Sequence, residues 1–246
     1  MKNVDQWRPT KFVRTRRGLR ASRDPACVAV SSRFIGDITA QRYEQILLAH
    51  AAGALLDVGC GHVPLYQVYR DLVTDIVCVD WSNTLHGNSL LDHVVDLNKK
   101  LPLASSTFDT VLLTDVLEHL ADPLFTMRDL ARVLRPGGKL LLGVPFFYWI
   151  HEEPHDYYRY TEFALARFCE LSELKIICLE AYGGLPEVLL DLSSKAIGTL
   201  PNPLPTILRP LHAAATHLNS FSPVRKLSEW TRSQFQLGYV LVAQKL

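Results

Sequence analysis

The chain has 246 residues, 48% of them hydrophobic, which is enough for one large domain with a full core and an elaboration. Its formal net charge of +1 says nothing about the partners of the protein as a whole. No uncharged run reaches the roughly 20 residues of a membrane span, the N-terminus has no apolar leader, and the five cysteines form no C-x-x-C pair. We therefore expect a soluble, cytoplasmic protein whose cysteines are core residues.

The N-terminal segment is basic. Residues 2–23 carry eight Lys or Arg and one acid, Asp5. Such a block of like charge is typical of a solvated, partly disordered arm, and contact with phosphate or anionic lipid is the alternative. Apolar residues at helical spacing from Ile38 to Leu47, closed by Gly53, then predict a helix that leads into the first strand.

An apolar run over residues 54–58 ends in a turn that contains two glycines, Gly59 and Gly61, and Asp57 stands just before them. Glycine lets the backbone turn sharply and approach a ligand without an intervening Cβ. A nucleotide-type ligand is the usual occupant of such a turn after the first parallel strand. Pro64 takes the sixth position of the G-x-G-x-x-G fingerprint, where glycine or alanine belongs, and this weakens the case for NAD or FAD.

Further strands and helices alternate along the chain. The second strand, Ile76–Asp80, ends in an acid that can accept hydrogen bonds from both hydroxyls of a ribose, although a capping aspartate is the structural alternative. Strands are predicted over residues 93–97, 108–114, 139–144, 174–179 and 237–243, with one helix from Pro123 to a stop at Pro136 and another from Thr161 to Cys169. This alternation predicts βαβ units and a parallel sheet.

Two segments carry a family resemblance: residues 108–119, FDTVLLTDVLEH, and residues 134–140, LRPGGKL. With the glycine turn and Asp80, they resemble the type 11 class I S-adenosylmethionine (SAM) dependent methyltransferases over residues 54 to 182 and the last strand. The resemblance implies an α/β, Rossmann-like sheet of seven strands, mostly parallel with an antiparallel last strand, helices on both faces, and SAM as cofactor. The family's D-x-G-x-G-x-G motif is incomplete, because Val63 replaces the third glycine.

The resemblance also assigns cofactor contacts by position. It implies that the two glycines line the methionine part, that Asp80 binds the ribose, and that the residues after the third strand flank the adenine. The backbone after the fourth strand would meet the methionine ammonium group, and His119 would lie near that pocket or only pack the helix. The whole predicted cofactor set is Asp57, Gly59, Gly61, Asp80, Trp81, Asp96, Leu97, Thr114, Asp115 and His119.

The segment after the fifth strand, residues 146–161, is rich in aromatic residues and histidines. Loops at the carboxyl ends of parallel strands face the ligand crevice, so we expect this one to contact the acceptor; a cover held by a structural Asp156–Arg159 pair is an equal alternative. Residues 151–155 spell H-E-x-x-H, but Pro154 disfavours the helix that a zinc site of this type needs, and we expect no metal. The candidate general bases are His155 and then His151, and the candidate acceptor contacts are Phe147, Tyr148, Tyr157 and Arg159.

About 50 residues, 183–233, separate the last two strands, which is too many for an ordinary connection. They combine apolar residues at helical spacing with four prolines, so a lid, a dimer surface and a membrane-surface patch are all compatible. We expect a helical lid over the crevice. The predicted organisation is a basic arm and helix (1–52), a SAM-binding core (53–182), this insertion (183–233) and the final strand (234–246).

These features predict SAM-dependent methyl transfer, with O-methylation favoured, to a small-molecule, glycan or lipid-linked acceptor. Residues 145–161 are similar to methyltransferases of bacterial glycan and lipid biosynthesis. A nucleic-acid methyltransferase is disfavoured, because the chain has neither a Pro-Pro-aromatic motif after the fourth strand nor a Pro-Cys dipeptide. A non-catalytic SAM-binding or NAD-binding module, peripheral contact with membrane, and a homodimer stay open.

Overall fold

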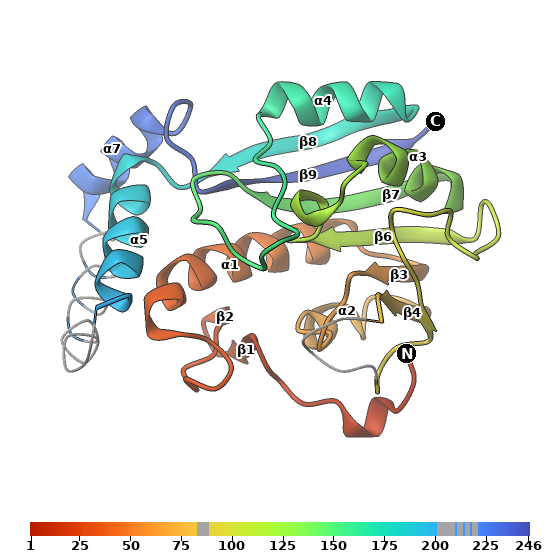
Figure 1. Cartoon of the computed structure of the whole chain (residues 1–246), viewed down its shortest axis with the longest axis horizontal. Helices are drawn as coiled ribbons and strands as arrows, with labels where there is room; N and C mark the ends of the chain where they lie inside the picture. The colour runs from red at the N-terminus through yellow and green to blue at the C-terminus, as the bar shows by residue number, and fades with distance from the viewer. Residues whose placement is uncertain (83–88, 201–209, 211–213, 215–216, 218–220) are drawn as a thin grey trace.

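The computed structural model describes residues 1–82, 89–200, 210, 214, 217 and 221–246. Its centre is a seven-stranded sheet in the order β5-β4-β3-β6-β7-β9-β8 (Figure 1). β9 runs antiparallel to both of its neighbours, and the other paired strands are parallel. The strands are β3 (Ala54–Val58), β4 (Asp75–Asp80), β5 (His93–Val94), β6 (Phe108–Thr114), β7 (Leu134–Pro145), β8 (Leu174–Tyr182) and β9 (Gly238–Lys245). The predicted fold class is therefore confirmed.

Helices cover both faces of the sheet (Figure 1). α3 (Pro123–Val133) and α4 (Glu162–Leu171) lie on one face, and α1 (Arg33–His50) and α2 (Tyr66–Tyr69) lie on the other. Successive side chains of a strand point to opposite faces, so Val111 and Leu113 of β6 pack in one core and Leu112 packs in the other. A strand covered on both sides is apolar at consecutive positions, which explains the unbroken run at the end of β6.

The helix ends follow local sequence signals, with one difference. Asp122 caps α3 by accepting a hydrogen bond from the backbone N–H of Phe125, and Thr161 caps α4 in the same way. α3 ends at Val133, before the predicted stop at Pro136, because Leu134 already pairs with Phe108 in the sheet. β5 is an exposed edge strand of two residues, shorter than the predicted 93–97.

The basic N-terminal arm is folded, so the prediction of partial disorder is wrong. After η1 (Val4–Gln6) it forms the hairpin β1 (Phe12–Thr15) and β2 (Gly18–Ala21), and η2 (Val30–Ser32) then leads into α1. Phe12 and Leu19 of the hairpin are buried against α1. These two apolar side chains, placed among the basic ones, give the arm enough buried surface to fold.

The insertion contributes two helices, α5 (Leu185–Gly198) and α7 (Ser222–Thr231), which pack against each other beyond the ends of β8 and β9 (Figure 1). α5 also contacts η2 of the arm. Positions 201–209, 211–213, 215–216 and 218–220, which hold most of the predicted proline-rich part, lie outside the described residues. Within the described part of the chain, no helix combines the length and the apolar character that crossing a membrane requires.

Candidate cofactor and acceptor site

The turn after β3 places backbone where a side chain would not fit. Gly59 and Gly61 have φ values of +65° and +52°, in the left-handed region that favours glycine. A Cβ on Gly59 would lie 2.5 Å from Cγ2 of Val116, so the turn packs tightly against the segment after β6. Val63, at the position of the family's third glycine, also has a positive φ of 51° and is fully buried. A β-branched residue rarely adopts that conformation, and here tight packing holds it.

Asp80, at the end of β4, has its carboxylate fixed beside this turn. One oxygen accepts the N–H of Gly61 and the other accepts the N–H of Trp81, each at 2.8 Å. A cavity of about 240 Å³ opens at the turn; its lining residues come from the turn, from the segment after β4 and from the arm, namely Gly61, His62, Ser89, Leu90, Gln6, Arg8 and Thr10. A fixed carboxylate and a glycine backbone beside a cavity suit the hydroxyls of a ribose, so the residues present fit a nucleoside cofactor.

Asp57, Asp96 and Leu97 are placed differently. Asp57 is buried, and its carboxyl accepts a hydrogen bond from the Tyr69 hydroxyl at 2.8 Å. Burial raises the pKa of Asp57 to about 7, against the effect of this hydrogen bond. Asp96 is exposed and pairs with Lys99, whereas Leu97 is buried in the core. Their predicted contacts with a cofactor stay predictions.

Asp115, directly after Thr114 and β6, receives two partners that the sequence did not reveal. Its carboxylate accepts a hydrogen bond from the Tyr43 hydroxyl of α1 at 2.6 Å and pairs with Nζ of Lys11 at 2.9 Å. Burial acts to raise the pKa of Asp115, but the Lys11 charge and the Tyr43 hydrogen bond lower it below its ordinary value. The arm is therefore tied to the site: the Trp7 indole N–H also donates to the carbonyl of Val63.

The loop after β7 is held by an ion pair. Nη1 and Nη2 of Arg159 each donate to one carboxylate oxygen of Asp156, at 2.6 and 2.8 Å. Arg159 also donates to the Tyr148 and Trp149 carbonyls. Burial acts to raise the pKa of Asp156, but the hydrogen bonds from Arg159 and from the backbone N–H of His151 lower it to about 2. The structural alternative considered for this pair is therefore present, and a substrate role for Arg159 stays a prediction.

The aromatic side chains of this loop face several elements. The His155 ring packs edge-on against Trp81, with centroids 5.2 Å apart, and its Nδ1 lies 3.1 Å from the Tyr157 hydroxyl. Phe147 stacks on Phe235 at 6.1 Å. Tyr148 contacts the His151 ring, with centroids 4.9 Å apart. The loop thus brings the predicted acceptor residues Phe147, Tyr148 and Tyr157 onto the same segment as His155, which contacts Trp81 of the predicted cofactor set.

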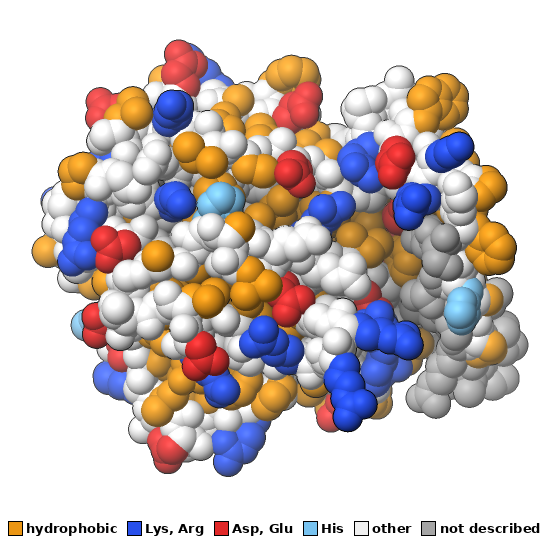
Figure 2. All heavy atoms as spheres, turned by 180° about the vertical axis from the view of Figure 1, so that it is seen from behind, with side chains coloured by type: hydrophobic (Ala, Val, Ile, Leu, Met, Phe, Trp, Pro, Cys, Tyr) orange, Lys and Arg blue, Asp and Glu red, His pale blue; other side chains and the backbone are white. Residues whose placement is uncertain are grey.

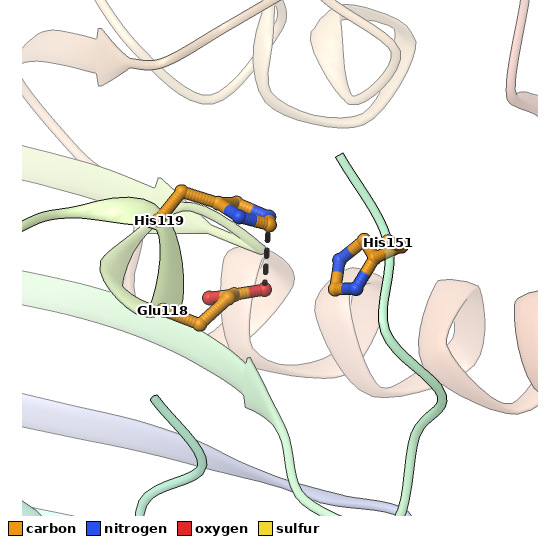
Figure 3. Close-up of side chains that lie close together, drawn as sticks. All are labelled: Glu118, His119 and His151. Carbon is orange, nitrogen blue, oxygen red and sulfur yellow. Dashed lines mark ion pairs between the residues drawn. The ribbon is translucent and has the colours of Figure 1, made fainter. Parts of the chain in front are cut away.

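Residues 151–155 are not helical, so the H-E-x-x-H pattern does not align its two histidines as it would on a helix. Instead, His151 lies beside Glu118 and His119 of η3 (Leu117–His119), with ring centroids of the two histidines 4.7 Å apart (Figure 3). Burial and the neighbouring His119 lower the pKa of His151, and complete burial raises the pKa of Glu118. Sequence reasoning missed Glu118; its position next to His119 in the quoted motif was the available signal.

Comparison with known proteins agrees with this geometry. Residues 56–142 match a family model described as a methyltransferase domain. The match covers about a third of the chain, and over that third the chain is similar to methyltransferase domains. The matched stretch begins within β3 and ends within β7, and it contains the glycine turn, Asp80, Asp115 and the Glu118–His119 pair.

Curated relatives of the methyltransferase domain are named ubiquinone biosynthesis O-methyltransferases. The protein from Xanthomonas euvesicatoria is 34% identical over 114 residues, which cover 41% of this chain and 46% of that protein. The protein from Parvibaculum lavamentivorans is 32% identical over 97 residues, which cover 36% and 38% of the two chains. The matches therefore span less than half the length of these relatives.

Solved structures share the fold over most of the chain. A geranyl diphosphate methyltransferase in complex with SAM has a TM-score of 0.56 at 15% identity and covers 91% of this chain and 93% of its own. A SAM-dependent methyltransferase from Archaeoglobus fulgidus has a TM-score of 0.55 at 15% identity, with 87% and 97% covered. A [4+2]-cyclase, with a TM-score of 0.53 at 18% identity and 85% and 82% covered, shares the fold as well. Because a cyclase has this fold, the activity needs an argument beyond the methyltransferase domain.

Proposed function

We propose that the chain transfers the methyl group of SAM to an oxygen of a small-molecule acceptor. The observation that carries the proposal is the carboxylate of Asp80, fixed by two backbone N–H groups beside the glycine turn and its cavity. Bound there, SAM supplies a methyl group that its sulfonium already activates. The protein's task is then to position the acceptor and exclude water.

The loop after β7 is the part of the chain that we expect to position the acceptor. Phe147, Tyr148 and Tyr157 offer aromatic surface and a hydroxyl, and His155 stands between Trp81 and Tyr157. We propose His155 as the base that takes the proton of an acceptor hydroxyl, with His151 as the second candidate. The names of the curated relatives support an acceptor oxygen.

A glycan or lipid-linked acceptor is a finer proposal within the same activity. It is supported by large apolar side chains that α5 and α7 expose near the loop end of the sheet, among them Leu189, Leu227 and Trp230. Acceptors with an apolar tail could cover such residues. Peripheral membrane contact and a homodimer, which would cover the same side chains, are proposed as consequences to be tested separately.

The test measures binding and turnover in turn. Calorimetry with the full chain should detect SAM and S-adenosylhomocysteine, with NAD as the negative control. Turnover is then followed as S-adenosylhomocysteine release with three acceptor sets: phenolic small molecules, sugars, and polyprenyl-linked sugars. Binding of SAM without release in any set would favour the non-catalytic module, and binding of NAD instead of SAM would overturn the assignment of SAM as the cofactor.

A further inference from the structure

Glu118 is a buried carboxylate for which the described residues provide no hydrogen-bond donor. Its side chain is fully buried, and neither oxygen has a hydrogen-bond partner. The nearest cationic candidate is Nε2 of His119, 3.7 Å from one oxygen, which is beyond hydrogen-bond distance. A buried carboxylate without a partner is costly, so a proton or a cation is expected at this position.

Two histidines present their ring nitrogens to this carboxylate with the far sides of their rings already engaged. Nδ1 of His119 lies 2.9 Å from the carbonyl oxygen of His155, which can only accept, so this nitrogen carries the proton. Nδ1 of His151 lies 3.3 Å from both the Trp149 carbonyl and the Asp156 carboxylate. In both rings Nε2 is then left with its lone pair, and such outer hydrogen bonds are typical of histidines that bind metals.

The three side chains converge on one point. One ligand atom from each of Glu118, His119 and His151 lies within 4.8 Å of the other two. Figure 3 shows His151 approaching the other two from a separate segment of chain. Two ligands at about 2.1 Å from one ion are at most roughly 4 Å apart, so a short movement of one side chain completes the site. The histidine side chains are 12% and 22% exposed, which leaves a route from solvent.

We propose that Glu118, His119 and His151 bind one divalent transition-metal ion. Two imidazoles and one carboxylate suit zinc, iron, manganese or cobalt, and leave coordination positions open. If the proposed methyl transfer is correct, the open positions lie where an acceptor oxygen can bind beside the aromatic loop; this part rests on the proposed function. The site differs from the H-E-x-x-H pattern, because His119 and Glu118 come from η3 and only His151 comes from the loop.

The segment that carries the ligands is fixed from several sides. The backbone carbonyl of Glu118 accepts the N–H groups of Tyr157 and Tyr158 at 3.0 and 3.2 Å. The Tyr160 hydroxyl donates to the carbonyl of Leu117 at 2.9 Å. Asp156, held by Arg159, accepts the backbone N–H of His151 at 2.9 Å. A site supported in this way loses little flexibility when an ion binds.

The alternative is a protonated Glu118 that holds no ion, and metal titration of the full chain separates the two. The chain is treated with chelator and titrated with Zn²⁺ and with Co²⁺, without SAM or acceptor. We expect one ion per chain by calorimetry and metal analysis, a raised Tm, and a Co²⁺ absorption spectrum of nitrogen and oxygen ligands. Absence of stoichiometric binding would overturn the proposal whatever the methyl-transfer assay gives.

Single substitutions then assign the ligands. Glu118→Gln, His119→Gln and His151→Gln should each weaken Zn²⁺ binding at least about 10-fold, and His93→Ala, at an exposed histidine of β5, should not. If Glu118→Gln fails to fold, the partly exposed His151 carries the test, with circular dichroism as the check of folding. Unchanged Zn²⁺ affinity in folded His151→Gln would overturn the site. Metal binding that leaves methyl transfer unaffected would overturn only the acceptor part.

Discussion

At the scale of single residues, the carboxyl edge of the sheet gathers buried and partly buried acids that differ in their partners. Asp57 has one hydroxyl donor and Asp80 has two backbone N–H donors. Asp115 has an ammonium and a hydroxyl, whereas Glu118 has no hydrogen-bond partner among the described residues. Partners decide the charge of a buried acid, because burial alone favours the neutral form. These differences make separate predictions for each residue.

Asp57 should make the folded protein less stable as the pH rises. Its pKa is about 7 in the folded chain against an ordinary 3.8, so the folded state binds the proton more tightly than the unfolded state. Stability contributed by this group is complete below pH 4 and is lost as the pH rises to about 7. Between pH 5 and 8 the loss is roughly 2.5 kcal/mol. Urea unfolding at both pH values should show that Asp57→Asn lacks this loss; an identical pH dependence would contradict the assignment.

Asp80 should contribute strongly to cofactor affinity. Asp80→Ala removes the carboxylate that the Gly61 and Trp81 backbone fixes, and should weaken SAM binding by roughly 2 kcal/mol or more, as for a charge-assisted hydrogen bond. Calorimetry measures the affinity. Asp71→Ala is the matched control, because the Asp71 side chain is exposed and pairs only with its neighbour Arg70 among the described residues. Equal SAM affinity in Asp80→Ala would remove the ribose assignment.

His155 should matter for turnover and little for cofactor binding. If it takes the acceptor proton, His155→Ala lowers kcat by about 10²-fold or more while SAM affinity stays near that of the unchanged protein. Its backbone carbonyl, which accepts from His119, is retained in the variant. Steady-state kinetics and calorimetry together make the test. A normal kcat with a lower Tm would show that the ring only packs on Trp81.

At the scale of elements, local signals predicted the structure wherever an apolar run or a helix cap stands out along the sequence. β6 matches the predicted 108–114, and α3 begins at the predicted Asp122-Pro123 cap. The hairpin of the arm was missed, because a run of basic residues hides the two apolar side chains that anchor it, Phe12 and Leu19. β5 was predicted too long, because only two of its residues find a partner strand.

Some residues of the candidate site could be predicted from the sequence, and others are brought together only by the tertiary structure. The glycine turn and Asp80 follow from strand ends and spacing, and their side-by-side position is fixed by parallel pairing of β3 and β4. The pair between Lys11 and Asp115 joins residues 104 positions apart, and no local pattern distinguishes Lys11 from the other basic residues of the arm. The approach of His151 to Glu118 likewise depends on tertiary structure.

α5 is anchored by a buried ion pair, and this predicts a stability effect. Lys195 bonds Asp191 one turn away, both side chains are almost fully buried, and the Lys195 ammonium lies 4.1 Å from the centre of the Tyr148 ring. Lys195→Met leaves the Asp191 charge uncompensated and should cost about 3–5 kcal/mol. The double variant Asp191→Leu, Lys195→Met should recover much of this loss. Urea unfolding measures both, and Lys175→Met, at an exposed lysine of β8, is the control.

Recovery by the double variant is the informative result. It would show that the single variant fails through an unpaired charge. If both variants are equally unstable, the contact of Lys195 with Tyr148 is what holds α5 to the acceptor loop. Stability unchanged in Lys195→Met would contradict the buried pair altogether.

At the scale of the whole molecule, part of the positive charge of the arm is paired with acidic side chains. Lys11 pairs with Asp115 and Arg23 pairs with Asp37. On the face shown in Figure 2, Lys and Arg side chains are interspersed with Asp and Glu. The tip of the hairpin exposes two neighbouring basic side chains, Arg16 and Arg17, to a possible anionic surface.

Apolar exposure is concentrated in the insertion and the acceptor loop. Trp230 of α7 is 80% exposed, and Ile150 of the loop is 70% exposed. Large apolar side chains left in water mark surfaces that bind lipid, protein or ligand. Electrostatic contact with anionic lipid weakens in salt, whereas apolar contact does not. Binding at low and at high salt therefore separates the contribution of the basic hairpin from that of the exposed apolar side chains.

Flotation with liposomes tests peripheral membrane contact. Deleting residues 1–23 would remove the buried hairpin, so substitutions are the sharper tool. With anionic vesicles at low salt, we expect Arg16→Glu, Arg17→Glu to lower binding at least about 10-fold, since each basic residue near such a surface contributes about 1 kcal/mol. Trp230→Ser should lower the part of the binding that persists in high salt. Arg167→Glu, at an exposed position of α4, is the control. If the unchanged chain does not float with anionic vesicles at either salt concentration, the exposed side chains of α5 and α7 are left to cover the acceptor or a second copy of the chain.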